Sequence, residues 1–131
     1  MGKILLDTDI LIYILEKADK SFLEKIIGEY DLYISVITYF EFLVGAYRTN
    51  KLFLKDLLEN NFFIIPITEE IADKGAKMQA KLMEKGTPID PRDIVIGATA
   101  IVERMPLCTF NLKHFSKLKT FGLQTIDIRN L

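Results

Sequence analysis

Four oxygen-bearing side chains, far apart in the sequence, are of the types that bind hard metal ions. Asp7 ends a short apolar run, Glu41 lies within a helical pattern, Asp93 follows a proline-containing loop, and Asn111 follows another apolar run. Carboxylate and amide oxygens without a cysteine or histidine cluster favour Mg²⁺ or Mn²⁺ over zinc. A divalent ion at such a site activates water and stabilises the charge that develops on a phosphoryl group. These residue types therefore predict phosphodiester hydrolysis, provided that the fold brings them together.

Some of these polar residues have an equally good structural interpretation. Asp7, at the end of a strand, is a turn former or helix cap as readily as a metal ligand. Asn111 is likewise an ordinary turn residue. For Asp9 a helix cap is the favoured role. These positions alone leave the choice between structure and chemistry open.

Glu41 fits a structural role less well. It lies three residues after Thr38, which is the spacing of a capping box at the start of a helix. Helical spacing also places Glu41 on one face with Ile37, Val44 and Gly45, which predicts an apolar stripe that faces the core. Because an unpaired carboxylate is costly to bury, we expect Glu41 to have a metal-binding or catalytic role.

Asp93 raises the same question. Asp90 and Pro91 are typical of an N-cap and a first helical residue, so Asp93 falls in the first turn, where a carboxylate suits the helix dipole. Gly97 and Ala100 lie on the same helix face as Asp93, and their small size would let this helix approach the sheet closely. Asp93 is then expected to point toward the carboxyl edge of the sheet.

Alternating strand and helix patterns must bring these residues together. Strands are predicted at 3–7, 32–35, 62–66, 107–110 and 125–128, and helices at 10–17, 21–29, 36–47, 51–59, 68–85, 91–103 and 112–117. This alternation predicts one α/β domain over residues 1–131, a layered α/β/α structure with a mostly parallel central sheet of about five strands. Strand C-termini and helix N-termini share one edge of such a sheet, where the four candidate residues are expected to meet.

Composition limits the class of protein further. Hydrophobic residues make up 50% of the chain and charged residues 27%, and the apolar runs are far shorter than the ~20 residues that span a membrane. Because the chain starts without an apolar leader, we expect a cytoplasmic protein. The single cysteine, Cys108, excludes an internal disulfide and a thiolate zinc site. His114 has no histidine partner and is predicted to be structural or solvated.

Four segments of the chain resemble the four sequence blocks of the PIN domain, in order and in spacing. The segments are 5–12, 35–45, 93–100 and 109–115, and they are most similar to those of the VapC-type toxins of prokaryotes. The resemblance implies a PIN-like fold and a magnesium- or manganese-dependent endoribonuclease, the toxin of a toxin–antitoxin pair. Such a toxin is usually a homodimer, and a cognate antitoxin inhibits it by placing its tail in the active site.

The resemblance also assigns the site residues by position. Asp7, Glu41 and Asp93 take the acidic places of the family, and Asn111 takes the fourth. Many members carry Asp in that fourth place, so this chain has one charge fewer and its affinity for a second metal ion is open. Asp9 and Asp90 are further acids that could compensate. The net charge of −1 gives no general attraction to RNA, so local cations are needed, and Arg48 and Arg92 are the candidates.

Two other functions stay open at this point. Asp7 and Asp9 also resemble the DxD opening of haloacid-dehalogenase-type phosphatases, in which the first Asp is a nucleophile and the second an acid. That family expects Thr or Val where Leu11 stands, and Asp90 and Asp93 have the wrong spacing for its later acidic pair. The second alternative is a catalytically inert PIN-like module that binds RNA or a protein partner, and the retention of three acids argues against it.

Overall fold

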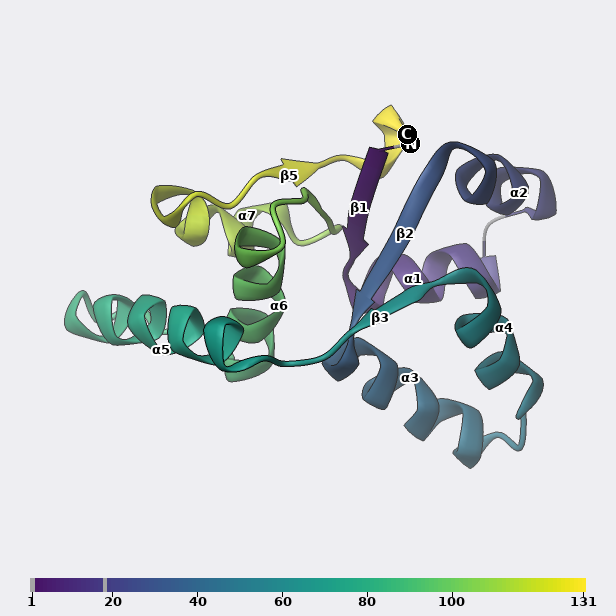
Figure 1. Cartoon of the computed structure of the whole chain (residues 1–131), viewed down its shortest axis with the longest axis horizontal. Helices are drawn as coiled ribbons and strands as arrows, with labels where there is room; N and C mark the ends of the chain where they lie inside the picture. Colours follow the sequence, from purple (N-terminus) through teal and green to yellow (C-terminus); the bar gives the residue numbers. More distant parts are fainter. Residues whose placement is uncertain (1, 18) are drawn as a thin grey trace.

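The computed structural model describes residues 2–17 and 19–131, and its strands form one sheet (Figure 1). The strands are β1 (Gly2–Leu6), β2 (Tyr30–Ser35), β3 (Phe63–Ile65), β4 (Leu107–Cys108) and β5 (Thr125–Ile126). They all pair in parallel, in the order β3-β2-β1-β4-β5. The order reverses its direction between β1 and β4, and parallel α/β sheets bind ligands at the carboxyl ends of the strands at such a point.

Helices connect the strands along the chain. They are α1 (Thr8–Ile12), α2 (Lys20–Glu29), α3 (Val36–Arg48), α4 (Phe53–Asn61), α5 (Glu69–Glu84), α6 (Pro91–Val102) and α7 (Leu112–Phe115). A π-helical turn, η1 (Tyr13–Lys17), extends α1, and 3-10 turns, η2 (Ser116–Phe121) and η3 (Ile128–Asn130), follow α7 and β5. The predicted order of elements and the parallel five-stranded sheet of an α/β fold are confirmed.

Apolar side chains build a core on each face of the sheet. Ile4 and Leu6 of β1 belong to a core that includes residues of α1, α2, α3 and α4. Leu5, between them, belongs to a second core with residues of α5, α6, α7 and η2. Successive side chains of a strand point to opposite faces, so a strand covered on both faces must be apolar at every position. This is why Ile4, Leu5 and Leu6 are an uninterrupted apolar run in the sequence.

Several elements differ from their predicted bounds. α1 begins at Thr8 rather than at residue 10, because the carboxylate of Asp7 caps it. α4 begins at Phe53 rather than at residue 51, because Asn50 adopts a left-handed backbone conformation (φ 55°) that separates α4 from α3. β4 and β5 are two residues long instead of the four predicted, and Asp127 already caps the 3-10 turn after β5.

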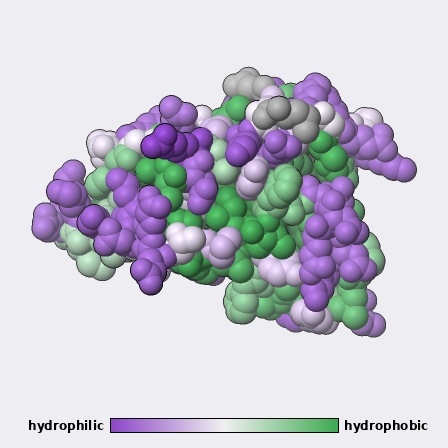
Figure 2. Space-filling model, in the orientation of Figure 1, coloured by the Kyte–Doolittle hydropathy of each residue, from purple (hydrophilic) through white to green (hydrophobic). Residues whose placement is uncertain are grey.

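Part of the apolar surface remains exposed. Figure 2 shows apolar side chains in the middle of the viewed face, with hydrophilic surface over α5 to the left. On the edge strand β3, Phe63 is 56% exposed and stacks on Tyr33 of β2, with ring centroids 4.8 Å apart. On α3 and at the start of α4, exposed apolar side chains form what we term the α3–α4 surface: Phe40, Val44, Tyr47, Leu52 and Phe53. Among the described helices, none is long and apolar enough to span a membrane.

Candidate active site

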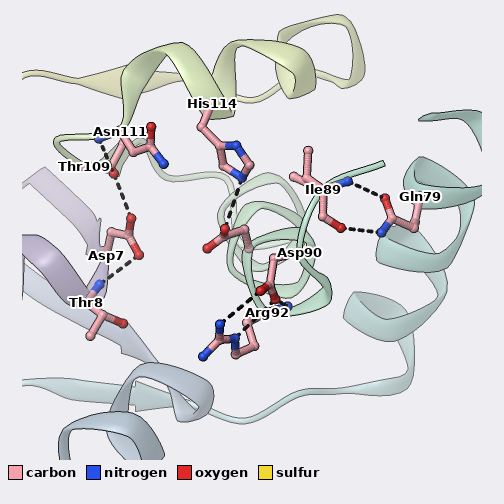
Figure 3. Close-up of polar contacts among 10 residues, drawn as sticks. Asp7, Thr8, Gln79, Ile89, Asp90, Arg92, Thr109, Asn111 and His114 are labelled. Carbon is pink, nitrogen blue, oxygen red and sulfur yellow. Dashed lines mark hydrogen bonds and ion pairs between the residues drawn. The ribbon is translucent and has the colours of Figure 1, made fainter. Parts of the chain in front are cut away.

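The carboxylate of Asp7 is held between the ends of β1 and β4, where the strand order reverses (Figure 3). Its Oδ1 accepts a hydrogen bond from the backbone N–H of Thr8 (2.8 Å), and its Oδ2 accepts one from the hydroxyl of Thr109 (2.7 Å). Asp7 and Thr109 are buried, with 7% and 2% of their surface exposed. Asp7 is therefore a helix cap and also a fixed carboxylate at the predicted edge. Each of its oxygens keeps a second lone pair for a further partner.

Thr109 connects Asp7 to Asn111. Its hydroxyl donates to Asp7 and accepts from the backbone N–H of Asn111 (3.0 Å). The Asn111 side chain is exposed, makes no capping bond to α7, and lies next to Thr109 on the side of His114 (Figure 3). Asn111 thus reaches the predicted edge. Thr109 is a site residue that the sequence did not reveal, because a single hydroxyl has no spacing pattern.

Asp93 lies in the first turn of α6, after the N-cap Asp90 and Pro91, as predicted. Its Oδ2 is 3.1 Å from Nε2 of His114, on α7. When Asp93 is ionised, the ring N–H of His114 donates this hydrogen bond. His114 therefore orients a candidate ligand, a specific form of the structural role that was predicted for it.

Gly97 of α6 makes its close contact with the segment α7–η2 and not with the sheet. A Cβ on Gly97 would collide with the side chain of Leu118 in η2, and it would lie 3.9 Å from Phe115 in α7. The missing side chain therefore lets the α7–η2 segment pack against α6. This packing brings His114 to Asp93.

The loop before α6 is held by α5. Gln79 of α5 donates to the carbonyl of Ile89 (2.5 Å) and accepts from its backbone N–H (3.2 Å), as Figure 3 shows. Ile89 is buried and directly precedes Asp90, which caps α6. Gln79 thus fixes the point at which the helix that carries Asp93 begins.

Glu41 of α3 has two polar partners. Its Oε1 accepts from the hydroxyl of Thr8 (3.3 Å), and its Oε2 accepts from the guanidinium of Arg92 (3.0 Å). The predicted capping box is wrong, because α3 is capped by Ser35, three residues before Thr38. Glu41 is therefore free of a capping role.

The predicted apolar stripe through Glu41 is also wrong. Val44 is 44% exposed and Gly45 is exposed too, whereas the buried residues of α3 are Thr38, Phe42 and Ala46. The Glu41 side chain is 27% exposed, so it lies beside the buried row and not within it. Because an acid at this border reaches solvent and cationic partners, burial does not by itself force a metal-binding role.

Arg92 joins two acids of the site. Its guanidinium lies 3.0 Å from Glu41 Oε2 and 3.0 Å from Asp90 Oδ2. These carboxylates, Asp90 before Glu41, raise the pKa of Arg92 above its usual range, and hydrogen bonds from Arg92 hold the pKa of Asp90 below its usual range. Of the two predicted RNA contacts, Arg92 is thus bound to acids, and Arg48 is exposed at the end of α3.

Asp9 brings unbalanced negative charge to the site. The prediction that it caps a helix is wrong, because Asp7 caps α1. Asp9 Oδ2 accepts from the backbone N–H of Phe110 (3.2 Å), while its buried Oδ1 has no hydrogen-bond partner among the described residues. Burial, and then the charge of Asp7, raise the pKa of Asp9 to about 6. The same two causes, in the same order, raise the pKa of Asp93.

The oxygen donors at this edge are of the chemical types that bind a hard cation. Within residues 2–17 and 19–131, no group of three or more His, Cys, Asp and Glu side chains is arranged to hold a metal ion. Glu41 is bound to Arg92 instead. The unpartnered oxygen of Asp9 and the raised pKa values of Asp9 and Asp93 mark an excess of negative charge that a cation would balance. All-oxygen ligands of this kind select Mg²⁺ or Mn²⁺.

A basic hollow lies beside the acidic edge. It is lined by Asn111, Lys113, His114, Ser116 and Lys117. Both lysines are exposed. Their place beside the site was not visible in the sequence, because two lysines at helical spacing are most often only solvated. Positive side chains next to an acidic centre suit a substrate with a charged backbone.

Comparisons with known proteins agree on one family. A family model described as PIN domain matches residues 4–120. Ribonuclease VapC1 of Methanocaldococcus jannaschii is 38% identical over 126 residues, which cover 96% of this chain and 88% of that protein. A chain of VapBC-1 from nontypeable Haemophilus influenzae superposes with a TM-score of 0.82 at 27% identity, covering 97% of this chain and 98% of that chain. A chain of a toxin–antitoxin complex from Klebsiella pneumoniae gives a TM-score of 0.69 at 27% identity, with 86% and 90% covered.

Proposed function

The chain belongs to the PIN domain family, and from this premise we propose that it is an endoribonuclease that hydrolyses RNA with Mg²⁺ or Mn²⁺ as the toxin of a toxin–antitoxin pair. One observation carries the proposal beyond family membership. The acids that the family pattern requires follow β1 or lie in α3 and α6, and Asp7 lies at the reversal point of the sheet. Parallel α/β sheets bind ligands at this point.

Asp7 and Asp93 would hold the ion. Glu41 would also bind the ion once it has released Arg92. Asn111 offers an amide oxygen in the fourth place. When bound, Mg²⁺ or Mn²⁺ supplies a water of lowered pKa and positive charge for the phosphoryl oxygens. Because Asn111 replaces the more common acid, the chain has less charge for a second ion.

Hydrogen bonds from neighbouring groups keep the carboxylates of Asp7 and Asp93 in position. The backbone N–H of Thr8 and the hydroxyl of Thr109 each donate to one oxygen of Asp7, and the ring of His114 binds one oxygen of Asp93. Groups that orient ligands in this way commonly matter for metal affinity and activity almost as much as the ligands. The carboxylates of Asp7 and Asp93 are thus held in position before an ion or RNA binds.

The proposed partners follow from the relatives and from the surface. A cognate antitoxin is the expected inhibitor, because similar chains occur in VapBC-1 and in a toxin–antitoxin complex. A homodimer is the expected assembly, and the exposed α3–α4 surface offers apolar area for it. A cytoplasmic location stays a prediction of the sequence.

The two alternative functions are less well supported. A phosphatase would use Asp7 as a nucleophile and Asp9 as an acid, but Asp9 is bound to the backbone of Phe110. An inert binding module would have no need for fixed carboxylates at the ligand edge. Trapping of an aspartyl-phosphate would favour the first alternative, and RNA binding without cleavage would favour the second.

Cleavage of single-stranded and structured RNA should be measured with Mg²⁺, with Mn²⁺ and with EDTA. We expect Asp7→Asn and Asp93→Asn to lower the rate by at least about 100-fold. Asn caps a helix as well as Asp does, so Asp7→Asn should keep the fold. Asp73→Asn, on the exposed side of α5, is the matched control and should cleave normally. Cleavage that survives EDTA, or full activity of the Asp7 and Asp93 variants, would refute the proposal.

A further inference from the structure

A half-exposed aromatic ring stands next to the acidic edge. Phe110 lies between Thr109, which holds Asp7, and Asn111, and 51% of its surface is exposed. Its backbone N–H donates to Asp9 (3.2 Å). The position of this ring is therefore tied to the acids through its own backbone and through its neighbour in the chain.

Tyr13 supports Phe110 from the side. The two rings are 5.5 Å apart and nearly perpendicular, at 89°. Tyr13 also contacts Phe22, with a centroid distance of 6.3 Å. Both rings pack against the core that Ile4 and Leu6 of β1 form with residues of α1 to α4. An edge-to-face pair leaves ring surface for a further aromatic partner in an offset stack. The core thus holds Tyr13 in place, and Phe110 remains accessible.

The two rings line a hollow together with Asp9, Ile12 and Lys17. Ile12 and Lys17 are five residues apart, a spacing that the π-helical turn η1 brings to one side of the helix. The predicted continuous α-helix over 10–17 would have separated them. The hollow therefore combines an aromatic wall with one cation, directly beside the candidate centre.

We propose that this hollow is a base-stacking subsite, in which Phe110 receives an unpaired nucleobase of the RNA adjacent to the scissile phosphate. The inference rests on the proposed ribonuclease function. A nucleotide within RNA has a flat aromatic base on a ribose that is linked to a phosphate on each side, so its binding site needs a ring and a nearby cation. Phe110 and Lys17 supply these two groups. Base-paired RNA keeps its bases stacked on one another, so the subsite selects single strands, loops or bulges.

Kinetics of Phe110 variants test this subsite. Phe110→Leu removes the ring but keeps apolar bulk against Tyr13, and Phe110→Trp keeps a ring. Stacking of one base corresponds to roughly a 5- to 150-fold change in affinity. We expect Phe110→Leu to raise KM for a single-stranded RNA within this range with much less effect on kcat, and Phe110→Trp to keep the normal KM. Phe63→Leu, on β3, removes a similarly exposed ring away from the site and should behave as wild type.

A base analogue gives a direct spectroscopic readout. RNAs with 2-aminopurine at successive positions should be bound to the Asp7→Asn protein, which keeps the RNA intact. We expect quenching at one position, loss of that quenching when Phe110→Leu is added, and its return with Phe110→Trp. Circular dichroism melting should show all variants folded.

Failure of the subsite can be told apart from failure of the proposed function. If the wild type cleaves no RNA, the ribonuclease proposal fails. If the wild type cleaves RNA but Phe110→Leu has a normal KM and unchanged quenching, only the subsite is refuted. If Phe110→Leu weakens binding of a protein partner and leaves RNA binding unchanged, the hollow is a protein contact and the subsite is likewise refuted.

Discussion

The hydroxyl of Thr109 fixes the position of Asp7. Thr109→Val is therefore the most informative single substitution among the residues that position the carboxylates of the site. Val has nearly the shape of Thr and removes only the hydroxyl. The change leaves Asp7 Oδ2 without a donor and the N–H of Asn111 without an acceptor. Thr109 and Asp7 are both buried, so water cannot freely replace the lost bonds.

The expected magnitude follows from these two hydrogen bonds. A bond to a charged group contributes about 1.5–3 kcal/mol and one between neutral groups about 0.5–1.5 kcal/mol, so the free energy of unfolding should fall by about 2–4 kcal/mol. In a chain of 131 residues, a loss of this size lowers Tm by roughly 8–16 °C. Loss of a contact that orients a metal ligand should also reduce metal affinity or RNA cleavage by about 10- to 100-fold.

Urea unfolding followed by circular dichroism gives the stability, and RNA cleavage over a Mn²⁺ titration gives the activity. Thr109→Ser is the matched control, because it keeps the hydroxyl, and it should stay within about 1 kcal/mol of wild type. If Thr109→Val were as stable and as active as Thr109→Ser, the hydroxyl would not position Asp7 and the reasoning would be refuted.

Further predictions concern the charges around the site. In chelator, Asp9→Asn should stabilise the fold by about 1–3 kcal/mol at pH 8 and not at pH 4. The pKa of Asp9 rises from 3.8 to about 6 on folding, so the wild type loses stability as pH rises through this window. If urea unfolding gave the same effect of Asp9→Asn at both pH values, this prediction would be contradicted. Arg92→Gln frees Glu41 and should tighten Mn²⁺ binding about two- to fivefold by calorimetry, whereas weaker binding would count against Arg92 as a competitor. Lys113→Ala and Lys117→Ala should each reduce the salt slope of RNA affinity by about 0.7, and Lys77→Ala on α5 should not; unchanged slopes would exclude the basic hollow from the RNA path.

The fold was largely predictable because its signals are local. Continuous apolar runs such as the one around Leu5 identify buried strands, and the Asp90-Pro91 pair identifies the start of α6. Parallel pairing follows from the alternation of these elements, so the carboxyl edge could be located without coordinates. Bounds were less accurate where a side chain decides them, as at Asp7, whose carboxylate starts α1 earlier than the apolar pattern does.

The contacts within the site were not predictable, because they join residues far apart through groups without a pattern. Thr109 and Asp7 are 102 residues apart, and His114 and Asp93 are 21 apart. A hydroxyl or one imidazole at either position would look the same in the sequence if it were solvated. Glu41 shows a different limit: its acidic identity was visible, but its neighbours on α3 depended on where that helix meets the sheet.

In the function proposed above, Asp7 and Asp93 share one divalent ion. A crystal structure of the protein grown with Mn²⁺, with anomalous diffraction recorded, would locate the ion directly. We expect a peak in contact with oxygens of both carboxylates, with Glu41 no longer bound to Arg92. A peak held elsewhere, or no ion at these carboxylates under conditions in which the protein cleaves RNA, would contradict the claim.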